Sequence, residues 1–305
     1  MRIPQARSRE ALATAPRFLR KPRRHNVEQL LKRLHADLRP EILKHMQPAM
    51  LLLDESVQFF IHLERHLLSR KLTRGASIFA QQVSRLRSDV IAFRAVVALG
   101  QEAPAAVLAR AFIEGVELAM SLVVDPDFSD RYFDSSDHSI FWKTSIGYGK
   151  IYPRVEAFLR LAGGTDEMIA ERIAHHKATK DALSGHVHAA NFSAMRSLAP
   201  PLLSHPGAFH IGELGTASAH LPRLCLLIAD ETQVFSACCL SLLIRPDAPE
   251  ALKHHKPKAE LGDVVASAHV LQTLLTEYGD QLEAHYATFL DYDTSAADAA
   301  PTSAT

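Results

Sequence analysis

The spacing of apolar residues restricts the fold of this chain more than any other feature. Apolar residues recur at the three- and four-residue intervals of an α-helix through most of the 305 residues. The alternation of apolar and polar residues that marks a half-buried strand is nearly absent. Hydrophobic residues make up 47% of the sequence and charged residues 22%, a balance that can bury a large core. The sequence therefore predicts an all-α protein, a multi-helix bundle.

Glycine and proline residues indicate where the helices end. Gly75, Gly100, the Gly163–Gly164 pair and Pro246 fall where an apolar period stops, and Thr165 before Asp166 is typical of an N-cap. The predicted helices span 26–46, 49–70, 76–99, 103–124, 137–162, 166–182, 184–197, 220–244 and 261–290. Two connections are long, at 198–219 and 245–260, and a loop of such length is often functional.

We predict one helical domain, residues 26–292, because no linker separates two independent apolar patterns. Residues 293–305 are small and polar, and they are predicted to be a disordered tail. Residues 1–25 form a basic flexible arm, whose first 24 residues hold eight Arg or Lys and one acidic residue.

The basic arm is a candidate for nucleic-acid binding, because Lys and Arg side chains contact phosphate groups. Its candidate residues are Arg17, Arg20, Lys21, Arg23 and Arg24. Two alternatives remain open. One is a solubilising terminus without a ligand, and the other is an organellar transit peptide, which is also rich in Arg and poor in acidic residues.

Cysteine usage and charge placement predict a cytoplasmic protein without a membrane span. Cys225, Cys238 and Cys239 lie in one apolar stretch, lack metal-type spacing and cannot form a disulfide framework, so a reducing compartment fits. The stretches 104–124 and 222–244 approach the length of a membrane span, but charged residues interrupt both. We expect them to be buried core helices. The interrupting residues are Arg110, Glu114, Glu117, Asp230 and Glu231.

Arg110, Glu114 and Glu117 form a polar ridge on the predicted helix 103–124, where they stand at i, i+4 and i+7 among apolar residues. This spacing places all three on one helix face. A buried charge needs a partner, because an unpaired ion in the interior costs several kcal/mol. The ridge therefore predicts a polar network inside the bundle. It either links helices as an ion-pair cluster or lines a cleft.

Histidine is concentrated between residues 175 and 220. This segment holds His175, His176, His186, His188, His205, His210 and His220. Imidazoles serve as metal ligands and as acid–base groups, so a metal-dependent hydrolase is one hypothesis. On a helix, however, His186 and His188 point apart. Surface or core histidines are the alternative, and we assign no metal ligand and no cofactor.

Several enzyme signatures are absent from the sequence. It has no His-Glu-x-x-His, no Cys-x-x-Cys, no phosphate-binding glycine loop, no Gly-x-Ser-x-Gly, and no Glu-x-x-His of the di-metal bundles. The Arg-x(4–6)-His spacing of helical ribonucleases of the HEPN type occurs at Arg20–His25, Arg39–His45 and Arg131–His138. Matches at this frequency are expected by chance from the arginine and histidine content.

Two segments together resemble an uncharacterised family of all-helical bacterial proteins. They are RLRSDVIAFRAVVALGQEAPAAVLARAFIEGVELAMSLVVDPDF (85–128) and DALSGHVHA (181–189). The family pattern is a helix with Arg-x-x-x-Glu, an Asp-Pro stop and a downstream Ser/His element. Arg110 and Glu114 match the first motif, and Asp125 and Pro126 match the second. Ser184, with His186 or His188, matches the third.

This resemblance implies an all-helical bacterial protein, sometimes encoded near defence or mobile-element genes, with no established reaction. Combined with the polar ridge, it predicts that Arg110, Glu114 and His186 or His188 meet in space, with Glu117, Asp125 and Ser184 nearby. We expect a non-catalytic regulatory or interaction module that forms a homo-oligomer. The first alternative is a HEPN-like ribonuclease in which arginine holds a phosphate and histidine moves protons. The second is the metal-dependent hydrolase.

Overall fold

The computed structural model describes residues 27–33, 35–36, 39–69, 72–187, 209–210, 216–217, 220–252 and 259–298. Over these residues the chain is an all-α helical bundle, as the apolar spacing predicts. One antiparallel strand pair accompanies the helices, β1 (Phe209–His210) with β2 (Thr216–Ala217). The helices in chain order are α2 (Val27–Arg33), α3 (Arg39–His45), α4 (Gln47–Leu68), α5 (Arg74–Val97), α6 (Glu102–Val124), α7 (Pro126–Asp134), α8 (His138–Phe141), the π-helix η3 (Trp142–Ile146), α9 (Tyr152–Leu161), α10 (Asp166–Val187), α12 (His220–Leu243) and α13 (Ala259–Asp298).

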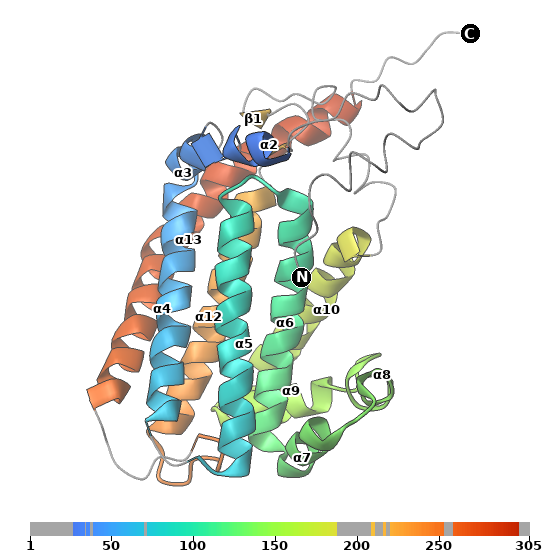
Figure 1. Cartoon of the computed structure of the whole chain (residues 1–305), viewed down its shortest axis with the longest axis vertical. Helices are drawn as coiled ribbons and strands as arrows, with labels where there is room; N and C mark the ends of the chain where they lie inside the picture. The colour runs from blue at the N-terminus through green and yellow to red at the C-terminus, as the bar shows by residue number, and fades with distance from the viewer. Residues whose placement is uncertain are drawn as a thin grey trace, which may run out of the picture.

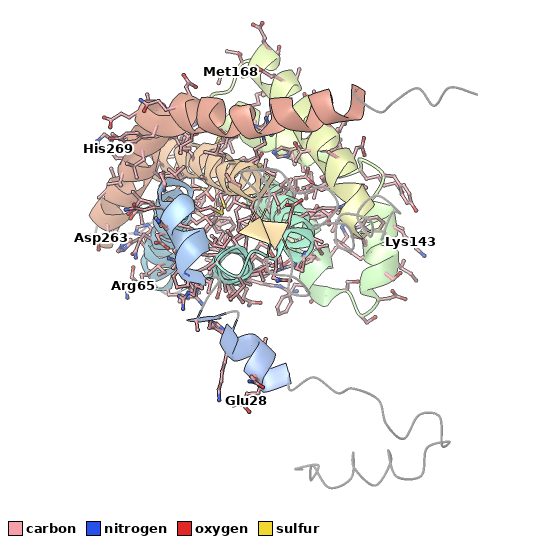
Figure 2. The ribbon with its side chains drawn as sticks, turned by 90° about the horizontal axis from the view of Figure 1, so that it is seen from above. Glu28, Arg65, Lys143, Met168, Asp263 and His269 are labelled. Carbon is pink, nitrogen blue, oxygen red and sulfur yellow. The ribbon has the colours of Figure 1, made fainter. Side chains whose placement is uncertain are left out.

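Helix α6 occupies a central position in the bundle. It packs against α5, α7, α9, α10 and α12, while α4 packs against α5, α12 and α13. Figure 1 shows the long helices α4, α5 and α6 side by side along the long axis, with α7, α8 and α9 gathered near one end. The view from above shows side chains filling the space between these helices (Figure 2).

Aromatic side chains join four helices in the core. The ring of Phe60 on α4 lies 5.9 Å from that of Phe112 on α6 and 6.2 Å from that of Phe235 on α12. Phe235 in turn stacks on Phe158 of α9 at 6.3 Å. All four side chains are fully buried. Because each large ring removes much apolar surface from water, this row contributes strongly to the stability of the bundle.

Helices α5 and α6 approach each other closely at Gly115. A Cβ atom at this position would lie 2.9 Å from Cδ2 of Leu86 on α5, a residue with no exposed surface. The same approach lets Nε2 of Gln82 donate a hydrogen bond to the carbonyl oxygen of Gly115 at 2.9 Å. Glycine therefore serves the packing of the two helices, which fixes the position of the polar ridge on α6.

Three segments differ from the predicted helices. The predicted break near residue 183 is wrong, because α10 continues to Val187 and the hydroxyl of Ser184 donates back to the carbonyl of Lys180 at 2.8 Å. The predicted helix 137–162 is divided into α8, η3 and α9, because the chain turns at Tyr148 and Gly149, both with positive φ. Helix α7 was not predicted. It begins at Pro126, a favourable first residue for a helix.

The two ends of the predicted domain also differ. Residues 26–46 were expected to form one helix, but α2 and α3 are separate, and Pro40 stands in the first turn of α3. At the other end α13 continues to Asp298, beyond the predicted domain boundary at residue 292. Thr165 is the N-cap of α10 as predicted, since its hydroxyl accepts a hydrogen bond from the amide of Met168 at 3.3 Å.

Among the residues that the structure describes, one helical segment, Leu221–Leu243 in α12, is long and apolar enough to cross a membrane, and half of its most apolar window is buried inside the bundle. In this structure α12 packs against α4, α6 and α13. That placement agrees with the expectation of a core helix.

Candidate functional site

The polar ridge of α6 faces α10. Arg110 pairs with Glu114, with 3.1 Å between Nε and Oε1, and both side chains are partly exposed. Nη1 of Arg110 donates to the carbonyl oxygen of Lys180 at 3.2 Å and also to the hydroxyl of Ser184. Arg110 therefore connects α6 to α10 near the end of α10. The structure thus brings together Arg110, Glu114 and Ser184, three of the residues that the sequence analysis grouped.

Helix α10 faces the bundle with charged side chains. Arg172, His176 and Lys180 stand four residues apart and so share one face. Ile169 and Leu183 are the buried apolar residues of α10 between positions 166 and 184. Because its inward stripe is charged, α10 has almost no apolar periodicity. Polar contacts of these three residues therefore join α10 to the bundle beside the apolar contacts of Ile169 and Leu183.

Six charged side chains alternate in sign along one row between α6, α10 and α12, which we call the ion chain. Its members in order are Lys180, Glu117, His176, Glu231, Arg172 and Asp230. All three cations come from α10. The carboxylates come from α6 and α12.

The buried half of the ion chain is centred on His176. Its Nδ1 lies 3.1 Å from Oε1 of Glu117, and its Nε2 lies 2.9 Å from Oε2 of Glu231. The side chain of Glu117 is 1% exposed and those of His176 and Glu231 are 0% exposed. Glu117 also accepts a bond from Nζ of Lys180 at 2.8 Å, and this ammonium lies 4.7 Å from the ring centre of Tyr152. The polar ridge therefore contacts a histidine through Glu117, and this histidine is His176.

Charge balance keeps His176 protonated. Burial alone favours the neutral imidazole, but the hydrogen bonds that the ring donates to Glu117 and Glu231 outweigh it and raise the pKa of His176 from 6.5 to about 9. Burial likewise raises the pKa of the Glu231 carboxyl, yet His176 and Arg172 prevail and leave it below its usual value. With three carboxylates and three cations, the ion chain is neutral overall, so few charges remain unpaired in the interior.

The far end of the ion chain resembles a metal site in composition. His175, Asp230 and Glu231 each offer one ligand atom, and these atoms lie within 4.8 Å of one another. However, Nη1 of Arg172 lies 2.9 Å from Oδ2 of Asp230 and 2.9 Å from Oε1 of Glu231. A divalent ion would have to displace this guanidinium, whose charge already balances the two acids. The geometry is that of an ion-paired arginine.

A cleft of about 500 Å³ opens beside this end, between α9, α10 and α12. Leu159, Ile169 and Val234 contribute apolar walls, whereas Arg172 and Asp230 contribute charge. Met168 stands at its rim, at the edge of the molecule in Figure 2. This cleft was not predicted from the sequence, because its walls come from three separate segments.

Asp125 has a structural role instead of a place in the ridge. Its Oδ1 accepts a hydrogen bond from the amide of Phe128 at 2.9 Å and so caps α7, and its Oδ2 lies 2.7 Å from Nε of Arg154. Partial burial raises the pKa of this carboxyl, but the bonds from Arg154 and Phe128 prevail and lower it. The prediction that Asp125 belongs with the ridge is therefore wrong. Its bonds join α7 to α9.

The remaining predicted residues lie partly or wholly outside the described residues. The backbone of His186 belongs to the last turn of α10, but its side chain is outside the description, as is the whole of His188. The arm residues Arg17, Arg20, Lys21, Arg23 and Arg24 are also outside it.

His176, Arg172 and the pair Asp230–Glu231 were not predicted to share a site. Two signals were present in the sequence. Three cationic positions at intervals of four indicate one face of α10, and two acids inside an apolar helix require partners. Joining them required the relative position of α10 and α12, which local patterns do not contain. No family model, curated protein or solved structure matches this chain.

Proposed function

We propose that this protein is a non-catalytic helical module that acts in the cytoplasm through regulation or interaction. One observation carries the proposal: Glu117, His176 and Glu231 are sealed from solvent and hydrogen-bonded to one another. An acid–base catalyst must reach the proton that it transfers, directly or through one water. Glu117, His176 and Glu231 lack such access. They serve to hold α10 against α6 and α12.

A second candidate is an RNA-cleaving enzyme of the HEPN-like kind. The contact between Arg110 and Ser184 favours it, since these residues come from two of the three motifs of the sequence resemblance. Arg110 also keeps some exposure to solvent, so it can hold a phosphate group. In this candidate function His186 or His188 would transfer the proton.

Purified full-length protein incubated with end-labelled single-stranded RNA tests the two candidates. A non-catalytic module leaves the RNA intact at every enzyme concentration, as do Arg110→Ala, His186→Ala and His188→Ala. Cleavage by the wild type that disappears in Arg110→Ala and in one histidine variant, with unchanged circular dichroism, would establish the nuclease. The same assay with added Zn²⁺ or Mn²⁺, and with His175→Ala, tests the metal-dependent hydrolase, which predicts metal-stimulated cleavage.

A further inference from the structure

Residues 138–151 form a protruding segment between α7 and α9, which we call the aromatic knob. It contains α8, the π-helix η3 and the turn that follows. Figure 1 shows α8 at the edge of the bundle, away from the long helices, and Figure 2 places Lys143 at the periphery. Short π-helical turns are rare and frequently mark functional positions. The polar network does not account for this segment.

The aromatic knob is firmly anchored to the body. The ring of Phe141 points inward and lies 5.4 Å from Phe128 and 5.7 Å from Tyr132, both on α7. At the other end Ile151 is almost fully buried. The side chains that the knob exposes are therefore presented by a fixed backbone.

Three large apolar or aromatic side chains of the knob are exposed to solvent. Ile140 is 59% exposed, Trp142 42% and Tyr148 83%. The rings of Trp142 and Tyr148 pack edge to face, 5.8 Å apart. A Cβ atom at Gly147 would lie 2.6 Å from the Trp142 ring, so the glycine allows this ring to approach the backbone closely. Exposed groups of this size and kind mark interaction surfaces.

The backbone conformation of the knob is unusual at its most exposed residue. Tyr148 has φ +58°, in the left-handed region, and Gly149 follows with φ +81°. For a bulky aromatic residue this conformation is strained, and such strain concentrates at functional positions. The turn directs a large ring outward where an ordinary loop would place glycine or asparagine.

The knob is also cationic. No acidic residue occurs from 138 to 155, and Lys143 and Lys150 are exposed. The nearest acids before the knob have partners of their own: Asp130 and Asp134 pair with Arg74, and Asp137 caps α8 through the amide of Ile140 at 2.9 Å. Among the described residues no carboxylate pairs with either lysine, and Nζ of Lys150 donates to the carbonyl oxygen of Lys143 at 2.8 Å, so both positive charges remain available to an external anion.

We propose that the aromatic knob inserts into the surface of an anionic phospholipid bilayer. Tryptophan and tyrosine favour the headgroup level, where an apolar ring and a polar tip are both satisfied, and nearby lysines attract anionic lipid. Ile140 adds an aliphatic side chain that suits acyl chains but cannot stack on nucleobases. The knob lies at the edge of the bundle (Figure 1), whereas single-stranded nucleic acid is bound in positively charged grooves. This inference goes beyond the proposed function and holds whether or not RNA is cleaved.

The fluorescence of Trp142 tests the proposal directly, because it is the single tryptophan of the chain. Full-length protein is titrated with vesicles of phosphatidylcholine alone and with vesicles containing one quarter phosphatidylglycerol. We expect a blue shift of the emission and co-sedimentation with the anionic vesicles, both reduced at high salt. The double variant Ile140→Ala/Tyr148→Ala should bind about tenfold more weakly, since each buried CH₂ adds to partitioning.

Two further variants locate the binding. Lys143→Glu with Lys150→Glu should remove the preference for anionic vesicles, whereas Ile244→Ala, an exposed apolar residue outside the knob, should change nothing. The arm is also basic, so its Arg17, Arg20, Lys21, Arg23 and Arg24 are replaced by Gln in the full chain. A blue shift that survives this change supports the knob. Vesicle binding without a blue shift, no vesicle binding, or binding insensitive to the knob variants would overturn the proposal.

Discussion

His176 is the residue on which the polar interior depends. Its imidazolium lies between two buried carboxylates, and each of these carboxylates has one further cation, Lys180 or Arg172. A buried network of this kind contributes little net stability compared with apolar packing, but it becomes very costly when one member is removed. The main effect of the ion chain is therefore on specificity, because arrangements of the helices that leave one of its charges unpaired are disfavoured. Its effect on the total stability of the bundle is smaller.

Replacing Glu117 by Gln tests this cost. The substitution keeps the size of the side chain but leaves His176 and Lys180 with less negative charge, and we expect it to lower the free energy of unfolding by about 3–5 kcal/mol. Urea denaturation monitored by circular dichroism measures the loss. The matched control is Glu156→Gln, which breaks an exposed pair with Arg160 and should have a much smaller effect. Equal losses in the free energy of unfolding for the two variants would show that the buried ion pairs of Glu117 are no more costly to break than an exposed pair.

Helix α10 differs from its neighbours in how it is attached. Helices α4, α5 and α6 bury continuous apolar stripes, whereas α10 presents three cations to the bundle. Apolar attachment is insensitive to pH, but attachment through titratable groups is not. Helix α10 should therefore be the part of the bundle whose stability responds most to protonation.

The pH dependence of stability follows from His176. Its pKa is higher in the folded protein, about 9, than in the unfolded chain, 6.5. Its contribution is therefore complete below pH 6.5 and is lost as pH rises through 9. The raised pKa corresponds to about 3 kcal/mol. We expect the free energy of unfolding to fall by roughly this amount between pH 6.5 and pH 9.5.

Denaturation at several pH values, together with hydrogen exchange, checks this expectation. His176→Gln should be less stable at pH 6.5 and should lose most of the slope between pH 6.5 and 9.5. Exchange of α10 amides should accelerate with pH more than exchange of α5 amides, after correction for the intrinsic rate. A wild-type slope that persists in His176→Gln would assign the pH dependence to another group.

At the scale of the whole molecule, the aromatic row and the ion chain together join α4, α6, α9, α10 and α12. Phe235 of α12 contacts both Phe60 of α4 and Phe158 of α9, and Glu231 lies one helical turn earlier on α12. Because the apolar and the polar contacts share α12, disturbing either one affects the other. Such shared contacts favour cooperative unfolding.

Phe235→Ala tests this coupling. The substitution leaves a cavity between α4, α9 and α12, and we expect a loss of about 3–5 kcal/mol in the free energy of unfolding. Helical content by circular dichroism and Trp142 fluorescence should report the same midpoint in denaturant, although Trp142 lies in the distant knob. Separate midpoints would show that the knob and its neighbouring helices unfold independently of the core.

The fold class and the charged face of α6 could be predicted from the amino-acid sequence. Both follow from local periodicity, since the apolar spacing and the Arg110–Glu114–Glu117 interval are properties of single helices. The sequence also indicated that buried charges needed partners. It did not identify His176, because the partner depends on how α10 is positioned against α6 and α12.

The position of α10, the cleft and the knob are apparent only in the folded protein. Neighbouring histidines on α10 point in different directions, so a change in helix rotation or in the extent of α10 would present another one to Glu117. Close packing at Gly115, the hydrogen bonds of Arg110 and the turn at Tyr148 fix the observed arrangement. These contacts join residues distant in the chain or depend on an unusual backbone conformation, and neither is encoded by apolar spacing.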